Sequence, residues 1–150
     1  MVQHSLLPTA QDALLEAVPA KRKGELAESG ENYLEAILVI KERNEAGLVR
    51  AVDIANELGI TKPSVSRALT QLKEQGLIKI LSSGAIVFTP DGQHIAHEVF
   101  SRHQQLTVFL QHAAGVPSDI AEHDACRIEH IISEQTMNGI RAYLNKHGLI

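Results

Sequence analysis

The stretch VRAVDIANELGITKPSVSRALTQLKEQGLI, residues 49–78, constrains the fold of this chain more than any other. Apolar residues at helical spacing predict a short helix over 51–58, with these side chains turned inward: Val52, Ile54, Ala55 and Leu58. Gly59 supplies a tight turn, and Thr61 or Lys62 begins a second helix with Pro63 in its first turn. The order of these signals predicts a helix-turn-helix.

The second helix has one apolar and one polar face. Val65, Leu69, Leu72 and Leu77 are expected to face the core, which leaves a short, donor-rich outer face. Such a helix can enter the major groove of DNA, where Arg pairs with guanine and Ser, Thr and Gln bond to bases or phosphates. We therefore expect DNA contacts from Thr61, Lys62, Pro63, Ser64, Ser66, Arg67, Thr70 and Gln71.

Two short β-rich runs follow the second helix. The segments LIKIL and AIVFT flank Ser82, Ser83 and Gly84, which predicts a hairpin with a glycine-containing turn. A hairpin at this place is the wing of a winged helix, and Ser83 at its tip is a further expected DNA contact. Small helical units with polar faces also serve as protein-interaction modules, but the joint order of helix, turn, polar helix and hairpin favours DNA binding.

Helices are expected on both sides of this head, so the fold class is mainly α. We predict one helix over 30–44, a long one capped by Thr89, Pro90 and Asp91, and two more over about 118–133 and 135–146. The C-terminal helices have wide apolar faces, which suit a homodimer interface. The expected organisation is an N-terminal extension (1–28), a winged helix-turn-helix domain (29–90) and an all-helical domain (91–150).

Charge and composition narrow the classes of partner. The chain has a net charge of −4, yet residues 49–90 carry five basic against three acidic residues, which suits a DNA-reading module. Aromatic content of 3% argues against a base-stacking platform for single strands. No run of about 18 apolar residues and no secretory signal is present, so we expect no membrane contact and a cytoplasmic location.

The hexapeptide ACRIEH contains the one cysteine of the chain. Helical spacing places Cys126, Glu129 and His130 on one face, and all three are metal donors. The thiol is a small buried apolar group, a reactive centre or a ligand. No HExxH motif occurs, which argues against a metallohydrolase, and we expect no enzyme. A redox-sensing repressor using Cys126 and a metal-independent winged helix remain alternatives.

Several segments together resemble one family, the diphtheria toxin repressor family of metal-activated bacterial regulators, including its manganese transport regulator branch. The segments are ENYLEAI, DIANELGITKPSVSRALTQLKEQGLI, VFTPDGQHIA, SRHQQL and DACRIEH, within residues 31–144. The resemblance implies a homodimeric winged-helix repressor of metal-homeostasis genes that binds an inverted-repeat operator with a divalent metal as corepressor. The short chain is similar to the manganese-type members. Residues 91–150 would then be the dimerisation and metal-binding domain.

The resemblance also implies a ligand set. It comprises Asn32, Glu35, His103, Cys126, Glu129 and His130, with Thr107 and Glu122 at a second site. Asn32 departs from the family pattern, which has aspartate or methionine there, and Cys126 is similar to the iron-type choice. Cys, His and Glu suit Fe(II), Zn(II), Co(II) or Ni(II), whereas Mn(II) prefers oxygen. We therefore expect Fe(II) first and Mn(II) second, with the ion joining the DNA-reading head to the dimerising helices.

Overall fold

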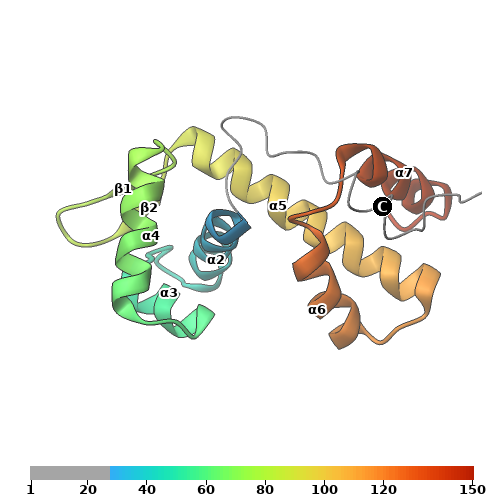
Figure 1. The fold of residues 1–150 in the computed structure, drawn as a ribbon, viewed down its shortest axis with the longest axis horizontal. Coiled ribbons are helices and arrows are strands. Elements are labelled where there is room, and N and C mark those ends of the chain that lie inside the picture. The colour runs from blue at the N-terminus through green and yellow to red at the C-terminus, as the bar shows by residue number, and fades with distance from the viewer. Residues whose placement is uncertain (1–27) are drawn as a thin grey trace, which may run out of the picture.

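A computed structural model describes residues 28–150, so nearly all of the predicted N-terminal extension lies outside the described residues. The elements are α2 (Glu28–Arg43), α3 (Ala51–Leu58), α4 (Lys62–Glu74), β1 (Ile78–Ile80), β2 (Ile86–Phe88), α5 (Pro90–Phe109), a π-helical turn η1 (Leu110–Ala114), α6 (Ser118–Ile128) and α7 (Glu134–Lys146). Figure 1 shows α5 crossing the molecule, with α2–α4 and the hairpin toward one end and α6 and α7 toward the other. In the described part of the chain, no helix is long and apolar enough to cross a membrane.

The helix-turn-helix is present as predicted. Gly59 ends α3 in the left-handed region at φ 64°, and the Thr61 side chain caps α4 by accepting a hydrogen bond from the Ser64 amide. The expected inward position of Val52 is wrong, because its side chain is 43% exposed. Ile54 and Ala55 define the buried face of α3, and Val52 lies roughly 110° around the helix from the middle of that face.

The wing is also present. Strands β1 and β2 pair antiparallel, with Ile78 opposite Phe88 and Ile80 opposite Ile86. The Ile86 amide donates to the Val49 carbonyl at 2.8 Å, so the hairpin is attached to the segment that precedes α3. These pairings confirm the predicted winged helix-turn-helix.

The start of α5 is fixed to this head. Thr89 caps α5, accepting from the Gly92 amide at 3.2 Å and donating its hydroxyl to the Gly76 carbonyl at 2.7 Å. Gly92 lies so close to the wing that a Cβ there would stand 1.8 Å from the Leu77 carbonyl oxygen. Because only glycine fits, α5 and the base of the wing can pack backbone against backbone.

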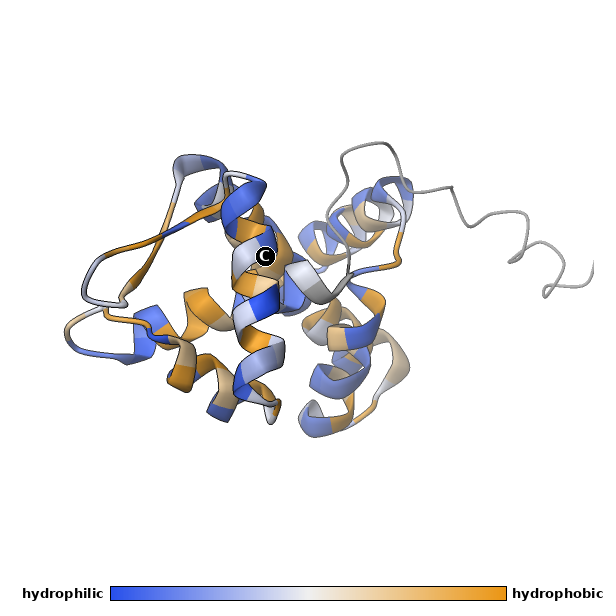
Figure 2. Cartoon of the chain, turned by 60° about the vertical axis from the view of Figure 1, so that its left-hand side comes forward, coloured by the Kyte–Doolittle hydropathy of each residue, from blue (hydrophilic) through white to orange (hydrophobic). Residues whose placement is uncertain are grey.

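Two hydrophobic clusters lie along α5, and Figure 2 shows hydrophobic and hydrophilic residues alternating along the helices. The head cluster is built around Leu34, Ile37, Ile54, Leu72 and Ile78, and the C-terminal cluster around Leu106, Ala125, Met137, Ile140 and Leu144. Helix α5 packs against α2 in the first part and against α6 and α7 in the second. One continuous helix therefore belongs to both halves of the fold.

The helix predicted over 118–133 is shorter than expected. It ends at Ile128, and a turn over 129–131 leads to α7. Ser133 caps α7 with extended backbone at ψ 152° and accepts from the Thr136 amide, so the preceding helix must stop before it. Ile131 lies beyond the end of α6, and its side chain is 74% exposed.

Candidate metal centre

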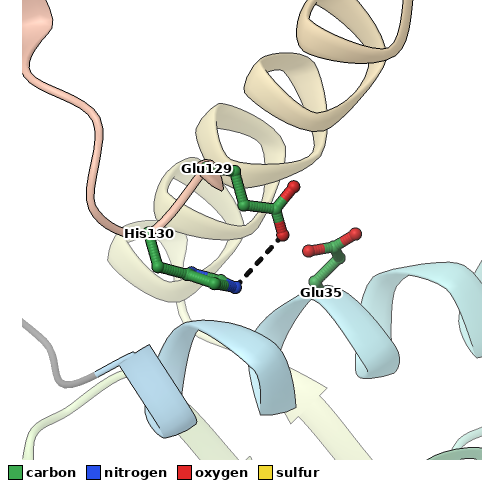
Figure 3. A group of neighbouring side chains, drawn as sticks. All are labelled: Glu35, Glu129 and His130. Carbon is green, nitrogen blue, oxygen red and sulfur yellow. Dashed lines mark ion pairs between the residues drawn. The ribbon is translucent and has the colours of Figure 1, made fainter. Parts of the chain in front are cut away.

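Three potential metal ligands from distant parts of the sequence meet between α2 and the end of α6. Glu35, Glu129 and His130 each offer a ligand atom, and these atoms all lie within 4.8 Å of one another. Figure 3 shows Glu35 projecting from α2 toward Glu129 and His130, which approach from the turn after α6. Within residues 28–150 no other group of three or more His, Cys, Asp or Glu side chains converges in this way.

The helix end explains how two consecutive residues reach the same site. Glu129 is the C-cap of α6, still with helical backbone angles, and His130 is the first residue of the turn that follows, so both side chains leave the same end of the helix. Glu35 comes from α2, whose neighbouring Leu34 and Ile37 are buried in the head cluster. The site therefore joins the DNA-reading head to the C-terminal helices.

Hydrogen bonds orient the two residues from the turn. Glu129 is fully buried, and its Oε2 lies 2.9 Å from Nδ1 of His103 on α5. His130 Nε2 lies 2.7 Å from Oδ1 of Asn32 and 3.2 Å from Oε1 of Glu129. Because an amide oxygen only accepts, Nε2 carries a proton that points to Asn32. Asn32 and His103 thus border the cluster, as the predicted ligand set implies.

Several buried atoms of the cluster have no hydrogen-bond partner. These are Glu35 Oε2, Glu129 Oε1 and His130 Nδ1. Glu129 Oε1 is near His130 Nε2, but the Nε2 proton is already directed to Asn32. An unsatisfied buried polar group costs about 1–3 kcal/mol, so such atoms call for a missing partner. A divalent cation would bind the two carboxylate oxygens, Glu35 Oε2 and Glu129 Oε1. The residues of the cluster therefore fit a divalent metal ion.

The pKa values of the two glutamates also indicate that the cluster has an excess of negative charge. Burial, together with the hydrogen bond and negative charge of Glu129, raises the pKa of Glu35 to about 8. Burial also raises the pKa of Glu129, but its close contacts with His103, His130 and Glu35 outweigh it and lower this pKa to about 2. Bound protons therefore neutralise part of the negative charge of the cluster.

The same carboxylates raise the pKa values of the two histidines. The hydrogen bond to Glu129 raises the pKa of His103, although burial opposes it. Burial lowers the pKa of His130, but its interactions with Glu129 and Glu31 raise it overall to about 9. At neutral pH the imidazolium charge of His130 thus takes the place that a divalent cation would have.

Cys126 is not part of this cluster. Its side chain is exposed on α6, so the interpretation as a small buried apolar group is wrong. Glu122, expected at a second site, is also exposed, and the Thr107 hydroxyl donates to the His103 carbonyl at 2.8 Å. The atoms that converge are therefore carboxylate oxygens and imidazole nitrogens, without sulfur.

Sequence reasoning missed two residues beside the cluster. Glu31 Oε2 lies 3.0 Å from Nη2 of Arg102 and 3.7 Å from Nδ1 of His130. The signal for Glu31 was available, because it precedes Glu35 by one helical turn and so shares its face of α2. Arg102 had no comparable signal beyond its place next to His103.

The expected DNA contacts lie at the surface of the head. Lys62, Pro63, Ser66, Arg67, Thr70 and Gln71 are exposed, as is Thr61, whereas Ser64 is half-buried. Thr61 and Ser64 also bond to each other at the start of α4, so capping occupies part of their capacity. Ser83 lies in the wing turn and accepts from the Ala85 amide at 3.4 Å. Most of these residues lie on α4, the predicted recognition helix, and their contact with DNA stays a prediction.

A winged helix-turn-helix joined through a buried carboxylate and histidine cluster to a helical domain defines a metal-dependent DNA-binding regulator. Comparison with family models agrees in both halves. Residues 25–85 match the N-terminal DNA binding domain of the iron dependent repressors, and residues 89–148 match their metal binding and dimerisation domain. The chain belongs to this family of transcriptional repressors, as the resemblance predicted.

Relatives and solved structures support this assignment. The chain is 37% identical over 119 residues to the transcriptional regulator MntR of Escherichia coli O6:H1, covering 79% of this chain and 74% of that protein. It is 27% identical over 121 residues to the iron-dependent repressor IdeR of Mycobacterium tuberculosis (strain H37Rv), covering 81% and 52%. A manganese-dependent transcriptional repressor in complex with manganese superposes with a TM-score of 0.72 at 28% identity, covering 81% of this chain and 53% of that one. The manganese regulator SloR superposes with a TM-score of 0.68 at 25% sequence identity, covering 77% of this chain and 53% of that one. This chain therefore spans about half the length of these structures.

Proposed function

We propose that this protein represses metal-homeostasis genes by binding an inverted-repeat operator as a homodimer when a divalent ion occupies the cluster of Glu35, Glu129 and His130. The observation that carries the proposal is the set of buried, unpartnered carboxylate oxygens between α2 and the end of α6. The domain limits would lie near residues 29–90 and 91–150. The protein would act in the cytoplasm, where its DNA target lies.

The ligands connect two parts of the fold. Glu35 belongs to α2 of the head, His103 to α5, and Glu129 and His130 to the end of α6. A bound ion supplies positive charge that offsets the repulsion between the carboxylates. Holding α2 against α6 would set the placement of the two recognition helices, which must reach major-groove faces about 34 Å apart.

The donor set changes the expected order of metals. The preference for Fe(II) rested on Cys126, and that thiol lies outside the cluster. Two carboxylates, the amide of Asn32 and two histidines form an oxygen-rich set, which suits Mn(II). We therefore propose Mn(II) as the first corepressor and Fe(II) as the second, with Zn(II), Co(II) or Ni(II) able to bind in vitro.

Anaerobic DNA binding with and without metal tests the proposal. An operator would first be selected from random duplexes in the presence of Mn(II) and then titrated with protein in Mn(II), Fe(II) or excess chelator. We expect tight dimer binding only with metal, and loss of binding in Glu129→Gln but not in the exposed-site control Glu42→Gln. Equal affinity in chelator would instead support a metal-independent winged helix. A response to oxidant that Cys126→Ser abolishes would support a redox sensor.

A further inference from the structure

A partly buried ion pair, Glu31 with Arg102, lies beside the histidine of the cluster. Glu31 Oε2 accepts a hydrogen bond from Arg102 Nη2 at 3.0 Å, which joins α2 to α5. The side chains are only 13% and 22% exposed, so the contact is well shielded from water. The same Glu31 oxygen is 3.7 Å from Nδ1 of His130, whose side chain is fully buried. Glu31 therefore faces an arginine and a candidate ligand at once.

The two nitrogens of His130 have different surroundings. Nε2 faces the cluster, at 3.2 Å from Glu129 Oε1 and 2.7 Å from Asn32 Oδ1. Nδ1 faces Glu31 and is buried without a hydrogen-bond partner. Nε2 is thus the nitrogen placed to bind an ion, and Nδ1 is the nitrogen that needs an acceptor.

A ligating histidine must expose a lone pair on the nitrogen that meets the metal. If Nε2 of His130 becomes a ligand, it gives up the proton that now points to Asn32, and the neutral ring carries its proton on Nδ1. Metal-binding histidines almost always donate this second N–H to a carboxylate, carbonyl or water, which fixes the ring and its tautomer. Glu31 is the carboxylate placed to accept it.

We propose that Glu31 is a positioning residue of the metal site: it accepts a hydrogen bond from Nδ1 of His130 when Nε2 is a ligand, while Arg102 holds the Glu31 carboxylate in place. This inference rests on the proposed metal-activated function. The present 3.7 Å separation exceeds a hydrogen bond, and a shift of about 1 Å closes it to ordinary N–H···O distance. Arg102 also compensates the charge of Glu31, so that a further carboxylate is tolerated near Glu35 and Glu129.

Metal affinity of the full-length protein tests this role directly. Mn(II) and Zn(II) affinities would be measured by competition with a chelator for wild type, Glu31→Gln and Glu31→Asp, with Glu42→Gln as an exposed control on the same helix. Loss of an outer-shell partner typically costs 10–100-fold in affinity, and we expect a loss of about this size for Glu31→Gln. Glu31→Asp should recover part of it, and Glu42→Gln should match wild type.

A double-mutant cycle separates positioning from a general structural role. If Glu31 acts through His130, Glu31→Gln should cause little further loss of affinity in a His130→Ala background. An equal loss in that background would overturn the proposal. Arg102→Lys provides a second route if Glu31→Gln fails to fold, and we expect it to weaken metal binding by a smaller factor in the same histidine-dependent way.

Histidine NMR of the Zn(II)-loaded protein gives a signature that stability alone would not move. Wild type should show a His130 Nδ1–H proton shifted downfield and slow to exchange, and Glu31→Gln should move it upfield. If wild type binds no metal, both the proposed function and this inference fail. If wild type binds metal and Glu31→Gln binds it within twofold, with an unchanged Nδ1–H resonance, only the role of Glu31 is refuted.

Discussion

Metal binding to this protein should release about two protons from Glu35 and His130 at pH 7. The pKa of Glu35 is raised to about 8 and that of His130 to about 9, so both groups are protonated before an ion arrives. At pH 7 these values correspond to about 0.9 proton on Glu35 and about 0.99 on His130, which a ligating metal must displace. Glu129, with a pKa of about 2, has none to give. The logarithm of the affinity should therefore rise by about 2 per pH unit near neutrality.

Calorimetry measures this number directly. Mn(II) would be titrated into the protein at pH 7 in buffers that differ in ionisation enthalpy, since the slope of observed enthalpy against buffer enthalpy is the number of protons released. Glu35→Gln should lower the number by about 0.9, because the variant has no ionisable group there. Glu42→Gln, exposed on the same helix, should leave it unchanged.

Whereas metal affinity should rise with pH, the stability of the metal-free protein should fall as pH rises. A group whose folded pKa is raised stabilises the fold fully below its unfolded pKa and loses that contribution as pH rises through the folded value. For Glu35 this window extends up to about pH 8, and for His130 up to about pH 9. Heating the apo protein should therefore show a falling melting temperature between pH 6.5 and 9, while metal raises it most at the alkaline end. A release of less than half a proton, or no change in Glu35→Gln, would refute the reasoning.

Three further results are expected. Gly92→Ala should lower the free energy of unfolding by about 1–3 kcal/mol or more in denaturant titrations, because its Cβ would stand 1.8 Å from the Leu77 carbonyl oxygen; a smaller loss would show that the wing base can yield. Arg67→Ala should cost about 1–3 kcal/mol at one base position in operator titrations, whereas an even loss over all sequences would indicate a phosphate contact. Cys126→Ser should leave Mn(II) affinity within about twofold of wild type, since oxygen and nitrogen atoms form the cluster; a large drop would return the thiol to the ligand set.

The head of this fold follows from local signals in the sequence. Gly59, the Thr61 cap and the apolar spacing of α4 act over a few residues, so they predict the helix-turn-helix without knowledge of distant contacts. The wing is similarly local, because its turn contains Gly84 at φ 86° between two short β-rich runs. Only Val52, at the margin of a helical face, was placed on the wrong side.

The candidate site was predictable in part. Glu35, His103, Glu129 and His130 were expected from the resemblance, and the structure brings them together. Helical periodicity alone put Cys126 on the face of Glu129 and His130, but it extended α6 too far. The cap at Ser133 ends that helix early, so that Glu129 is its C-cap and His130 lies in the turn, while the Cys126 side chain is exposed on α6. Competition between a helix and the next cap is a tertiary outcome that periodicity does not report.

Because α5 is continuous, a small displacement near the metal site produces a larger displacement at the far end of the helix. Its residues from Pro90 to Phe109 form one helix about 30 Å long, anchored to the wing base at one end and packed on α6 and α7 at the other. Tilting a rod of that length by about 10° moves its tip by roughly 5 Å, more than the 3.4 Å rise between successive bases. His103 lies about 9 Å from the Phe109 end of α5, so a displacement of about 1 Å at His103 corresponds to about 3 Å at Pro90, close to one base step. Regulation of this kind needs no unfolding, only a stiff helix and a small angle.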